Sequence, residues 1–304
     1  KDIARTTGLT PATVGGIIYQ LVREGSVSCD ETLPSRGGRP SQSYALNAGY
    51  AHILVIALYV SGGKNLIHAQ VMDLYGTNIH KECDAHDLID VPVLEEVIDR
   101  CLEKFPNIAV LAVSIPGSEH QGLVTACDYP AFEGVDLIKV LTDRYHIMVL
   151  LENDANIASL GACVALHRIP AVLVGIYFPH YYFYPGSGIV IDTKIFKGAR
   201  GFGGEISYIP LGCDWTSLDY SDTPLVARHV AQMVAVVCGT VNPETVVLYG
   251  DFFSLECRTA IRQELERILR ARLMPGLLYK DRIEDDIMRG LFQCGLTAYQ
   301  KRFW

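Results

Sequence analysis

The chain has 304 residues, 49% of them hydrophobic, and a formal charge of −8. This length suits two or three domains with sizeable cores, and the acidic balance excludes a body that binds nucleic acid over its whole surface. No run of about 18 uncharged apolar residues occurs, so no membrane span is expected. The N-terminus does not resemble a signal peptide, and the nine cysteines form no C-x-x-C or C-x-C pair. Both observations favour a reduced, cytoplasmic protein.

The charge is not spread evenly along the chain. Residues 1–47 carry five basic and four acidic side chains, hence +1, which leaves −9 for the remainder. An acidic body with a mildly basic head indicates that a polyanion would contact the head alone.

The head, residues 1–47, is predicted to be a winged helix-turn-helix. A short helix precedes a turn at Gly8, and Thr10 is placed to cap a second helix with Pro11 at its first position. Residues 26–30 and 43–46 are the two expected strands of the wing. Helical spacing predicts a buried face on the second helix, made of Val14, Ile17, Ile18, Leu21 and Val22.

The expected DNA contacts of this head lie at the start and outer side of the second helix and in a glycine-rich linker. Residues at the start of such a helix meet base edges, and arginines spaced by glycines suit a narrow minor groove. The alternative interpretation of the linker is a solvated segment. The predicted contacts are Thr10, Ala12, Thr13, Gly16, Tyr19, Arg36 and Arg39.

Residues 48–165 are predicted to form a first α/β lobe. Strands are expected at 52–60, 66–72, 108–115 and 147–151, and helices at 91–105 and 134–145. The last strand runs directly into Glu152-Asn153-Asp154-Ala155-Asn156. Because α/β proteins place ligand groups at the carboxyl ends of strands, this pentapeptide is a candidate ligand contact. The alternative interpretation is a helix N-terminus, since Asn and Asp cap helices well.

Residues 166–286 are predicted to form a second lobe, and a helix at 287–304 is expected to pack back on the first. A strand at 189–191, a turn at Asp192-Thr193 and a strand at 194–196 lead into a glycine-dense loop that ends at Glu205. Glycine-rich backbone beside a single acid suits a polyhydroxylated ligand, whose hydroxyls donate to the carboxylate. The alternative is a plain hairpin with a long turn.

The order of these motifs along nearly the whole chain resembles the ROK family (repressors, open reading frames, sugar kinases), particularly its N-acetylglucosamine/xylose repressor branch. The matches are the Gly-Arg-Pro linker at 38–40, Pro116-Gly117, Asp128-Tyr-Pro-Ala-Phe132, the pentapeptide at 152–156 and Gly204-Glu-Ile at 204–206. The resemblance implies an α/β fold. A partial winged helix-turn-helix head would precede two actin-like (ribonuclease H-like) lobes, with a ligand cleft between them. In that family a further helix precedes the motif, inside which this chain begins.

The resemblance also implies the sugar contacts. They are Gly117, Asp128, Asn153, Asp154, Glu205 and Tyr208, the last at the position of a family histidine. The family's zinc cluster is reduced here to Cys213, so no structural zinc is expected.

The nucleotide side departs from the family. Ser61 stands near the family's phosphate-loop Asp, Tyr182-Phe183-Tyr184-Pro185-Gly186 replaces its second glycine loop, and only Gly250 remains of its adenine glycine pair. The first loop is therefore interpreted as an ordinary hairpin, and neither ATP nor magnesium is expected.

These expectations combine into a sugar-responsive, repressor-like transcription regulator. It would bind operator DNA through the head and a small sugar or sugar phosphate in the cleft, as a homodimer or homotetramer in the cytoplasm, with no membrane partner. No catalytic residue and no cofactor is expected. One alternative is an ATP-dependent sugar kinase that uses Asp154 as general base. Another is a scaffold with an empty cleft.

Overall fold

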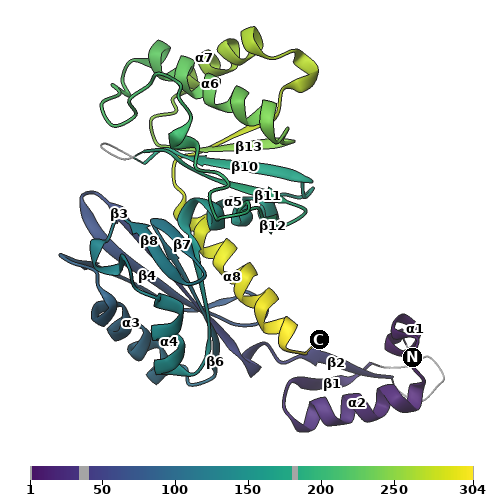
Figure 1. Cartoon of the computed structure of the whole chain (residues 1–304). Coiled ribbons are helices and arrows are strands. Elements are labelled where there is room, and N and C mark those ends of the chain that lie inside the picture. The colour runs from purple at the N-terminus through teal and green to yellow at the C-terminus, as the bar shows by residue number, and fades with distance from the viewer. Residues whose placement is uncertain (1, 34–40, 180–183, 304) are drawn as a thin grey trace.

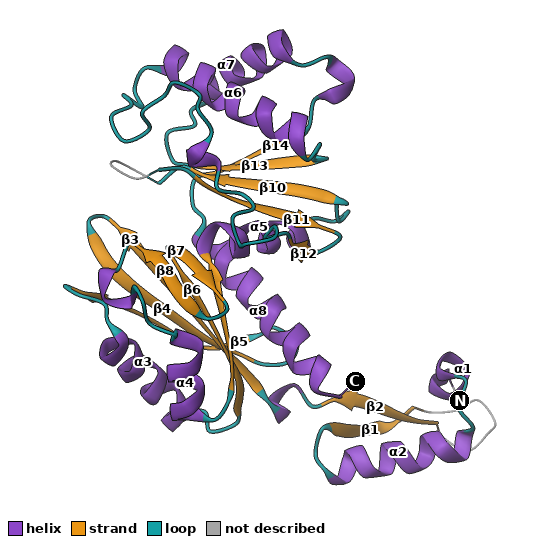
Figure 2. Ribbon diagram, viewed as in Figure 1, coloured by secondary structure: helices purple, strands orange, loops and turns teal. Residues whose placement is uncertain are grey.

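The structure, a computed structural model, describes residues 2–33, 41–179 and 184–303 and shows two α/β lobes and a projecting head (Figures 1 and 2). Each lobe is built on a five-stranded sheet. The orders are β5-β4-β3-β6-β9 in the first lobe and β12-β11-β10-β13-β14 in the second. In each sheet three antiparallel strands are followed by two parallel ones. The two lobes therefore share one topology.

The first lobe is centred on β3, which is buried on both faces, as expected of its continuous apolar run. One face packs against helices α3 and α4, and the other packs against α5 and α8. A hairpin of β7 and β8 follows β6. The bounds are β3 (His52–Ser61), β4 (Lys64–Met72), β5 (Asn78–His86), α3 (Val91–Lys104), β6 (Ile108–Ile115), β7 (Gly117–His120), β8 (Leu123–Cys127), α4 (Leu137–Tyr145) and β9 (Met148–Asn153).

In the second lobe, helices α6 and α7 cover the outer face of the sheet (Figure 1). Phe178 and Trp215 lie in the core beneath them, their ring centroids 5.4 Å apart. The bounds are β10 (Val172–Tyr177), β11 (Gly186–Ile191), β12 (Lys194–Ile195), α6 (Thr223–Thr240), β13 (Thr245–Tyr249), α7 (Leu255–Ile268) and β14 (Gly276–Lys280). Short 3-10 turns are η1 (Ala48–Tyr50), η2 (Pro130–Phe132), η3 (Ile206–Tyr208), η4 (Ala271–Leu273) and η5 (Lys301–Phe303).

Helices α5 (Asp154–Ala165) and α8 (Glu284–Gln300) cross between the two sheets (Figure 1). A Cβ on Gly161 would lie 1.8 Å from the carbonyl oxygen of Asp286, and one on Gly290 would lie 2.0 Å from that of Ile157. The helices therefore meet backbone to backbone. Sequence analysis placed α5 at the end of the first lobe, and in the structure it also packs on β10 and β11 of the second.

Asp286 anchors the start of α8 to the second lobe. It is 2% exposed, accepts a hydrogen bond of 2.8 Å from the Tyr249 hydroxyl, and pairs with Lys280 and Arg289. Tyr249 also donates to the Ala158 carbonyl of α5 at 3.3 Å. Strand β13 and both crossing helices are thus held at one point.

The head consists of α1 (Asp2–Thr7), α2 (Pro11–Arg23) and the antiparallel pair β1 (Val27–Leu33) and β2 (Ser41–Leu46). The Thr10 hydroxyl accepts from the Thr13 amide at 3.2 Å, which confirms the predicted cap. At its base, the Asn47 side chain donates to the Gly25 carbonyl at 2.8 Å, and Asn107 of the first lobe donates to the Gly49 carbonyl at 2.7 Å. The Tyr75 hydroxyl of the first lobe donates to the Leu46 carbonyl of β2 at 3.3 Å, which ties the head to the first lobe.

The predicted buried face of α2 is wrong. No residue of this helix is buried, and Ile17 and Val22 are 45% and 37% exposed. The elements packed against it are the six-residue α1 and strand β1, which are too small to cover an apolar stripe of this length.

The loop between β3 and β4 is a two-residue turn. Ser61 pairs with Lys64, and the intervening Gly62 and Gly63 have φ of 58° and 72°. Two left-handed residues are what the tightest hairpins require, so the interpretation as an ordinary hairpin is confirmed. Several boundaries differ from the predictions; among them, α4 begins at Leu137, β12 ends at Ile195 and α8 begins at Glu284. In the described part of the chain, no helix has the length and apolarity needed to cross a membrane.

Substituting alanine for Gly161 or Gly290 should destabilise the fold by about 3 kcal/mol or more, because the added methyl would overlap a backbone carbonyl. Gly239 in α6 is the matched control, since nothing lies within 4 Å of its Cβ position. Gly239→Ala should gain roughly 0.5–1 kcal/mol from helix propensity. Urea unfolding measures the free energy of unfolding of all three variants. Equal effects at the three sites would contradict the close crossing.

Candidate ligand site between the lobes

Asn153 ends β9 and caps α5, its Oδ1 accepting from the Asn156 amide at 2.9 Å. The capping interpretation is therefore correct for this residue. The same side chain has a second role, because its Nδ2 donates to the Gly117 carbonyl at 2.9 Å and to Asp154 Oδ1 at 3.0 Å. Asn153 thus joins the hairpin β7–β8 to the first residue of α5.

Asp154 lies in the first turn of α5, with Oδ1 accepting from the Ala155 amide at 2.7 Å and from Asn153. Burial raises the pKa of this carboxyl to about 7, and the negative charge of Asp128 adds to the shift. Carboxyl groups whose pKa is strongly shifted in this way cluster at functional sites. Both bonds from its neighbours reach Oδ1, so Oδ2 keeps capacity for a ligand.

Asp128 and Gly117 lie beside Asn153 and Asp154. The Asp128 amide donates to the Pro116 carbonyl at 3.0 Å, and a Cβ on Gly117 would lie 2.2 Å from the Ala126 carbonyl oxygen. Asp128 is exposed as a residue, yet partial loss of hydration raises the pKa of its carboxyl. The structure therefore brings four of the six predicted sugar contacts together.

Two buried polar atoms in this region have no hydrogen-bond partner among the described residues. They are the hydroxyl of Tyr129 and the Oδ1 of Asn156. Tyr129 follows Asp128, and the charges of Asp128 and Asp154 act on it. Because buried polar atoms are normally paired, these two indicate a place where a ligand or water completes the bonding.

The second lobe contributes Tyr177, at the end of β10. Burial raises the pKa of its hydroxyl, and the carboxylates of Asp154, Glu284, Asp128 and Asp251 add to the shift. Carboxylates gathered in one place disfavour a phosphate and suit a ligand that donates neutral hydroxyls.

Glu205 lies at the end of the glycine-dense loop, which is fastened to β11. The Ser187 hydroxyl donates to the Gly204 carbonyl at 2.7 Å, and a Cβ on Gly204 would lie 2.6 Å from the Ser187 carbonyl oxygen. Burial raises the pKa of Glu205. Tyr208 is 74% exposed and lies against Phe202, the ring centroids 5.2 Å apart.

Strand β11 connects this loop to Asp154. A Cβ on Gly188 would lie 2.4 Å from the Ala155 carbonyl oxygen, so β11 rests directly on the first turn of α5. In the described parts of the chain, however, neither Glu205 nor Tyr208 hydrogen-bonds to Asn153 or Asp154. Glu205 and Tyr208 thus follow a loop fastened to β11, the strand that rests on the first turn of α5, and they make no hydrogen bond to Asn153 or Asp154.

Sequence analysis missed an ion triad that joins the lobes. Lys197, after β12 of the second lobe, places Nζ 2.8 Å from Glu119 of β7 and 2.9 Å from Glu152 of β9. The two glutamates are only 10% and 14% exposed. Burial acts to raise the pKa of Glu119, but hydrogen bonds from Lys197 and the Gly122 amide hold it below its usual range. Burial prevails at Glu152 and raises its pKa. No local pattern marks Lys197, because both partners are far away in sequence.

A cavity of about 510 Å³ adjoins this triad. Its wall includes Glu119, Glu152, Lys197 and, from α8, Leu291 and Cys294. Asn153, Asp154 and Glu205 are not among its lining residues. The cavity therefore lies next to the predicted sugar contacts and does not contain them.

The predicted DNA contacts Thr10, Ala12, Thr13, Gly16 and Tyr19 are all exposed. Arg36 and Arg39, and Tyr182 and Phe183 of the second phosphate-loop segment, lie outside the described residues. At the segment where the family carries zinc, burial and the nearby Asp214 raise the pKa of the Cys213 thiol to about 11. The absence of a structural zinc there stays a prediction.

A comparison with known families decides the relationship. The sequence profile of the ROK family matches residues 60–218, just over half of the chain. This protein belongs to the ROK family.

Among relatives of this ROK protein is the xylose repressor of Caldicellulosiruptor bescii, 26% identical over 224 residues, which are 68% of this chain and 53% of the repressor. The chain spans about half the length of the curated repressors it matches. A solved ROK family transcriptional regulator, described as a homologue of the E. coli MLC protein, aligns over 97% of this chain and 91% of its own. Its TM-score is 0.71 at 14% identity.

A ROK hexokinase from Thermus thermophilus also shares the fold. It aligns over 83% of this chain and 99% of its own, with a TM-score of 0.64 at 18% identity. The fold is thus common to regulators and kinases, so the choice between them must come from the site residues.

Asp154→Asn should stabilise this protein increasingly as pH rises. A raised pKa means that the folded state opposes ionisation, so stability is lost as pH increases through about 7. We expect the free energies of unfolding of the variant and the parent to be similar near pH 4 and to differ by about 2 kcal/mol above pH 8. Chemical unfolding at pH 4.5, 7 and 8.5 measures this. The exposed Asp192→Asn is the control, and a pH-independent gap at Asp154 would contradict the shift.

Lys197→Met should destabilise the closed arrangement of the lobes by about 2 kcal/mol, because two largely buried carboxylates lose their cation. Lys194→Met, an exposed lysine on β12, should change stability by less than about 0.5 kcal/mol. Adding Glu119→Gln and Glu152→Gln to Lys197→Met should recover part of the loss. Urea unfolding reports stability and small-angle scattering reports lobe separation. No difference between the two lysine variants would contradict the triad's role.

Proposed function

We propose that this ROK protein is a sugar-responsive transcription regulator that binds DNA through its head and does not phosphorylate its ligand. It would act in the cytoplasm as a homodimer or homotetramer. The repressor names of its relatives support the regulatory class. The arguments for a sugar ligand and for DNA binding come from the residues around Asp154 and from the head, respectively.

The observation that carries the sugar proposal is the cluster of Gly117, Asp128, Asn153 and Asp154 around a buried carboxyl. A sugar hydroxyl would donate to Asp154 Oδ2, and further hydroxyls would complete the bonding of Tyr129 and Asn156. Glu205 and Tyr208 would close on the ligand from the glycine-dense loop.

Two observations support loss of kinase activity. The β3–β4 turn has Ser61 near the position of the family's Asp and carries no acid, so it lacks a carboxylate to position a metal ion beside a phosphate. The charges around Tyr177 are carboxylates, which would repel a triphosphate unless metal ions neutralised it.

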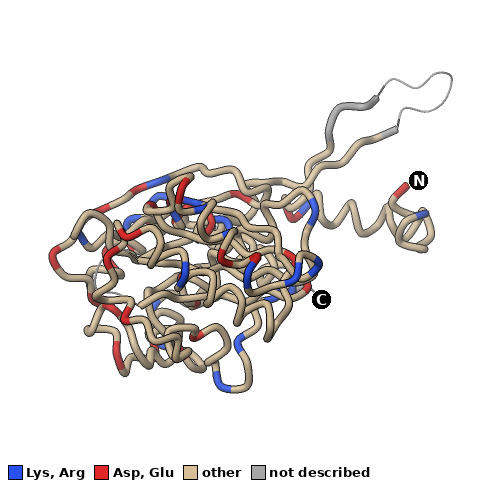
Figure 3. Tube along the Cα trace, turned by 90° about the horizontal axis from the view of Figure 1, so that it is seen from above, with Lys and Arg blue, Asp and Glu red and all other residues tan. Residues whose placement is uncertain are grey.

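The head supports the DNA proposal through its exposed second helix. From Pro11 to Val22, α2 has no charged residue, as the charge distribution in Figure 3 also shows. Thr10, Thr13 and Tyr19 would therefore contact base edges or phosphates through neutral hydrogen bonds. Arg36 and Arg39 would supply the electrostatic part of binding.

A sugar would regulate DNA binding if it bound one arrangement of the lobes better than another. Lys197 and α8 both connect the lobes, and the head is bonded to the first lobe through Leu46 and Tyr75. A change in lobe closure would therefore reposition paired heads in an oligomer.

Calorimetric titration with D-xylose, D-glucose, N-acetylglucosamine and their phosphates tests the ligand. At least one should bind, and Asp154→Asn should weaken it about tenfold to a hundredfold through loss of a charged acceptor. Asp192→Asn should bind normally. Duplexes selected from a random-sequence pool then test the head, with Tyr19→Ala expected to weaken binding. No sugar binding by the folded parent protein would refute the sensor proposal.

The alternative, an ATP-dependent sugar kinase, is favoured by one observation. A carboxyl with a pKa of about 7 suits a general base that removes a proton from a sugar hydroxyl. Coupled ADP release with the same sugars, ATP and magnesium discriminates the two. Turnover that disappears in Asp154→Asn would establish the kinase and overturn the regulator-only proposal.

A further inference from the structure

The covered face of β5 is polar throughout. Alternate residues of this edge strand, His80, Glu82, Asp84 and His86, are partly buried, whereas the residues between them are exposed. Helix α3 lies over the covered side and presents Cys101, which is fully buried. Polar side chains beneath an amphipathic helix need partners. Glu82 and Asp84 have one in Arg100, and His80 and Cys101 also lie against Glu82.

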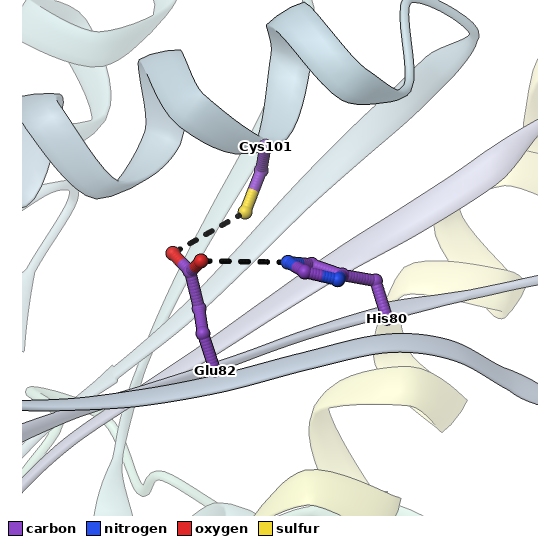
Figure 4. A group of neighbouring side chains, drawn as sticks. All are labelled: His80, Glu82 and Cys101. Carbon is purple, nitrogen blue, oxygen red and sulfur yellow. Dashed lines mark hydrogen bonds and ion pairs between the residues drawn. The ribbon is translucent and has the colours of Figure 1, made fainter.

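Three of these groups converge on one point (Figure 4). The Nε2 of His80 lies 3.4 Å from Glu82 Oε2, and the Sγ of Cys101 lies 3.9 Å from Glu82 Oε1. All three donor atoms fall within 4.8 Å of one another. Two residues come from the strand and the third from the helix above it, so the group spans two elements.

These separations are close to the edges of a metal coordination tetrahedron. With ordinary zinc bond lengths, the nitrogen–oxygen edge is about 3.4 Å and the sulfur–oxygen edge about 3.6 Å. The two separations, each to a different oxygen of Glu82, are 3.4 Å and 3.9 Å and need little or no contraction. His80 and Cys101 place their donor atoms within 4.8 Å of each other, so a metal ion would draw these two donors together and turn the carboxylate until one oxygen serves as ligand.

We propose that His80, Glu82 and Cys101 form a binding site for a divalent transition-metal ion of the zinc class. A thiolate and an imidazole select such ions over magnesium or calcium, which prefer oxygen ligands. Three protein ligands leave the fourth position open to water, so the ion is exchangeable. On binding, the Cys101 S–H bond breaks, the proton leaves to solvent and the metal–sulfur bond forms.

Arg100 occupies part of this site. Its Nη2 lies 3.1 Å from Glu82 Oε1 and also pairs with Asp84. Asp84 gives the guanidinium a second carboxylate, so Arg100 can release Glu82 and remain paired. Arg100 therefore competes with a metal ion for Glu82. The positive charge of Lys104 also acts to lower the pKa of the Cys101 thiol.

This site is separate from the family segment near Tyr208 and Cys213, where no zinc is expected. It also lies on a different edge of the sheet from Asp154, since β5 and β9 are the two outer strands of the first lobe. Metal binding and sugar binding can therefore fail independently.

The test is titration of the full chain with Zn²⁺, and with Co²⁺ as a spectroscopic probe, in a Cys29→Ser/Cys83→Ser background that removes both exposed thiols. We expect one equivalent per chain, with the near-ultraviolet absorption of a cobalt–thiolate bond. Mg²⁺ and Ca²⁺ should not compete. Absence of a stoichiometric site would overturn the proposal.

Cys101→Ser and His80→Gln should each weaken binding by at least about tenfold, the smallest loss typical even of outer-sphere partners. Cys257→Ser, which removes a buried thiol in α7 of the second lobe, is the matched control and should bind normally. Arg100→Gln should tighten binding several-fold, because it removes the competing cation. Circular dichroism verifies that each variant is folded. Unchanged affinity in His80→Gln, the variant least disruptive to packing, would overturn the proposal.

Discussion

The arrangement of the lobes depends on the contact between α5 and α8. Gly161 and Gly290 let the two helices cross with backbone against backbone, and the Asp286 carboxylate fastens the crossing to Tyr249, Lys280 and Arg289. Close-packed backbones cannot slide without overlap, so this crossing sets how the two sheets face each other. The position of Asp154 follows from it, because Asp154 begins α5 and its hydrogen-bond partners are the neighbouring Asn153 and Ala155.

The candidate site combines two kinds of polar environment. Around Asp154 the charges are carboxylates, whereas around Lys197 a cation neutralises two of them. Glu152 belongs to the second group and Asn153 to the first, although they are neighbours in sequence. Alternation along β9 sends adjacent residues in opposite directions, so one short motif supplies both the ligand contacts and the brace between the lobes.

Much of this was readable from sequence, because the informative motifs are local. Glu152-Asn-Asp-Ala-Asn156 follows a predicted strand, and the family resemblance pointed to Gly117, where the structure leaves no room for a side chain. The partners of Lys197 were not predictable, since they lie 78 and 45 residues away on another lobe. The exposure of Ile17 and Val22 was not predictable either. Helical spacing identifies an apolar face but not whether anything covers it.

The junction between head and body gives the head little freedom of its own. Asn47 bonds back to Gly25, the Tyr75 hydroxyl bonds to the Leu46 carbonyl at 3.3 Å, and the Phe292 ring of α8 lies against Gly76 in the same turn. The head is thus attached to the body at the turn 73–76, and α2 lies at the far side of the head from this attachment. The same turn contacts α8, the helix that packs between the two sheets. Because displacement grows with distance from the point of rotation, even a slight tilt of α8 would move the tip of the head much further than it moves the turn.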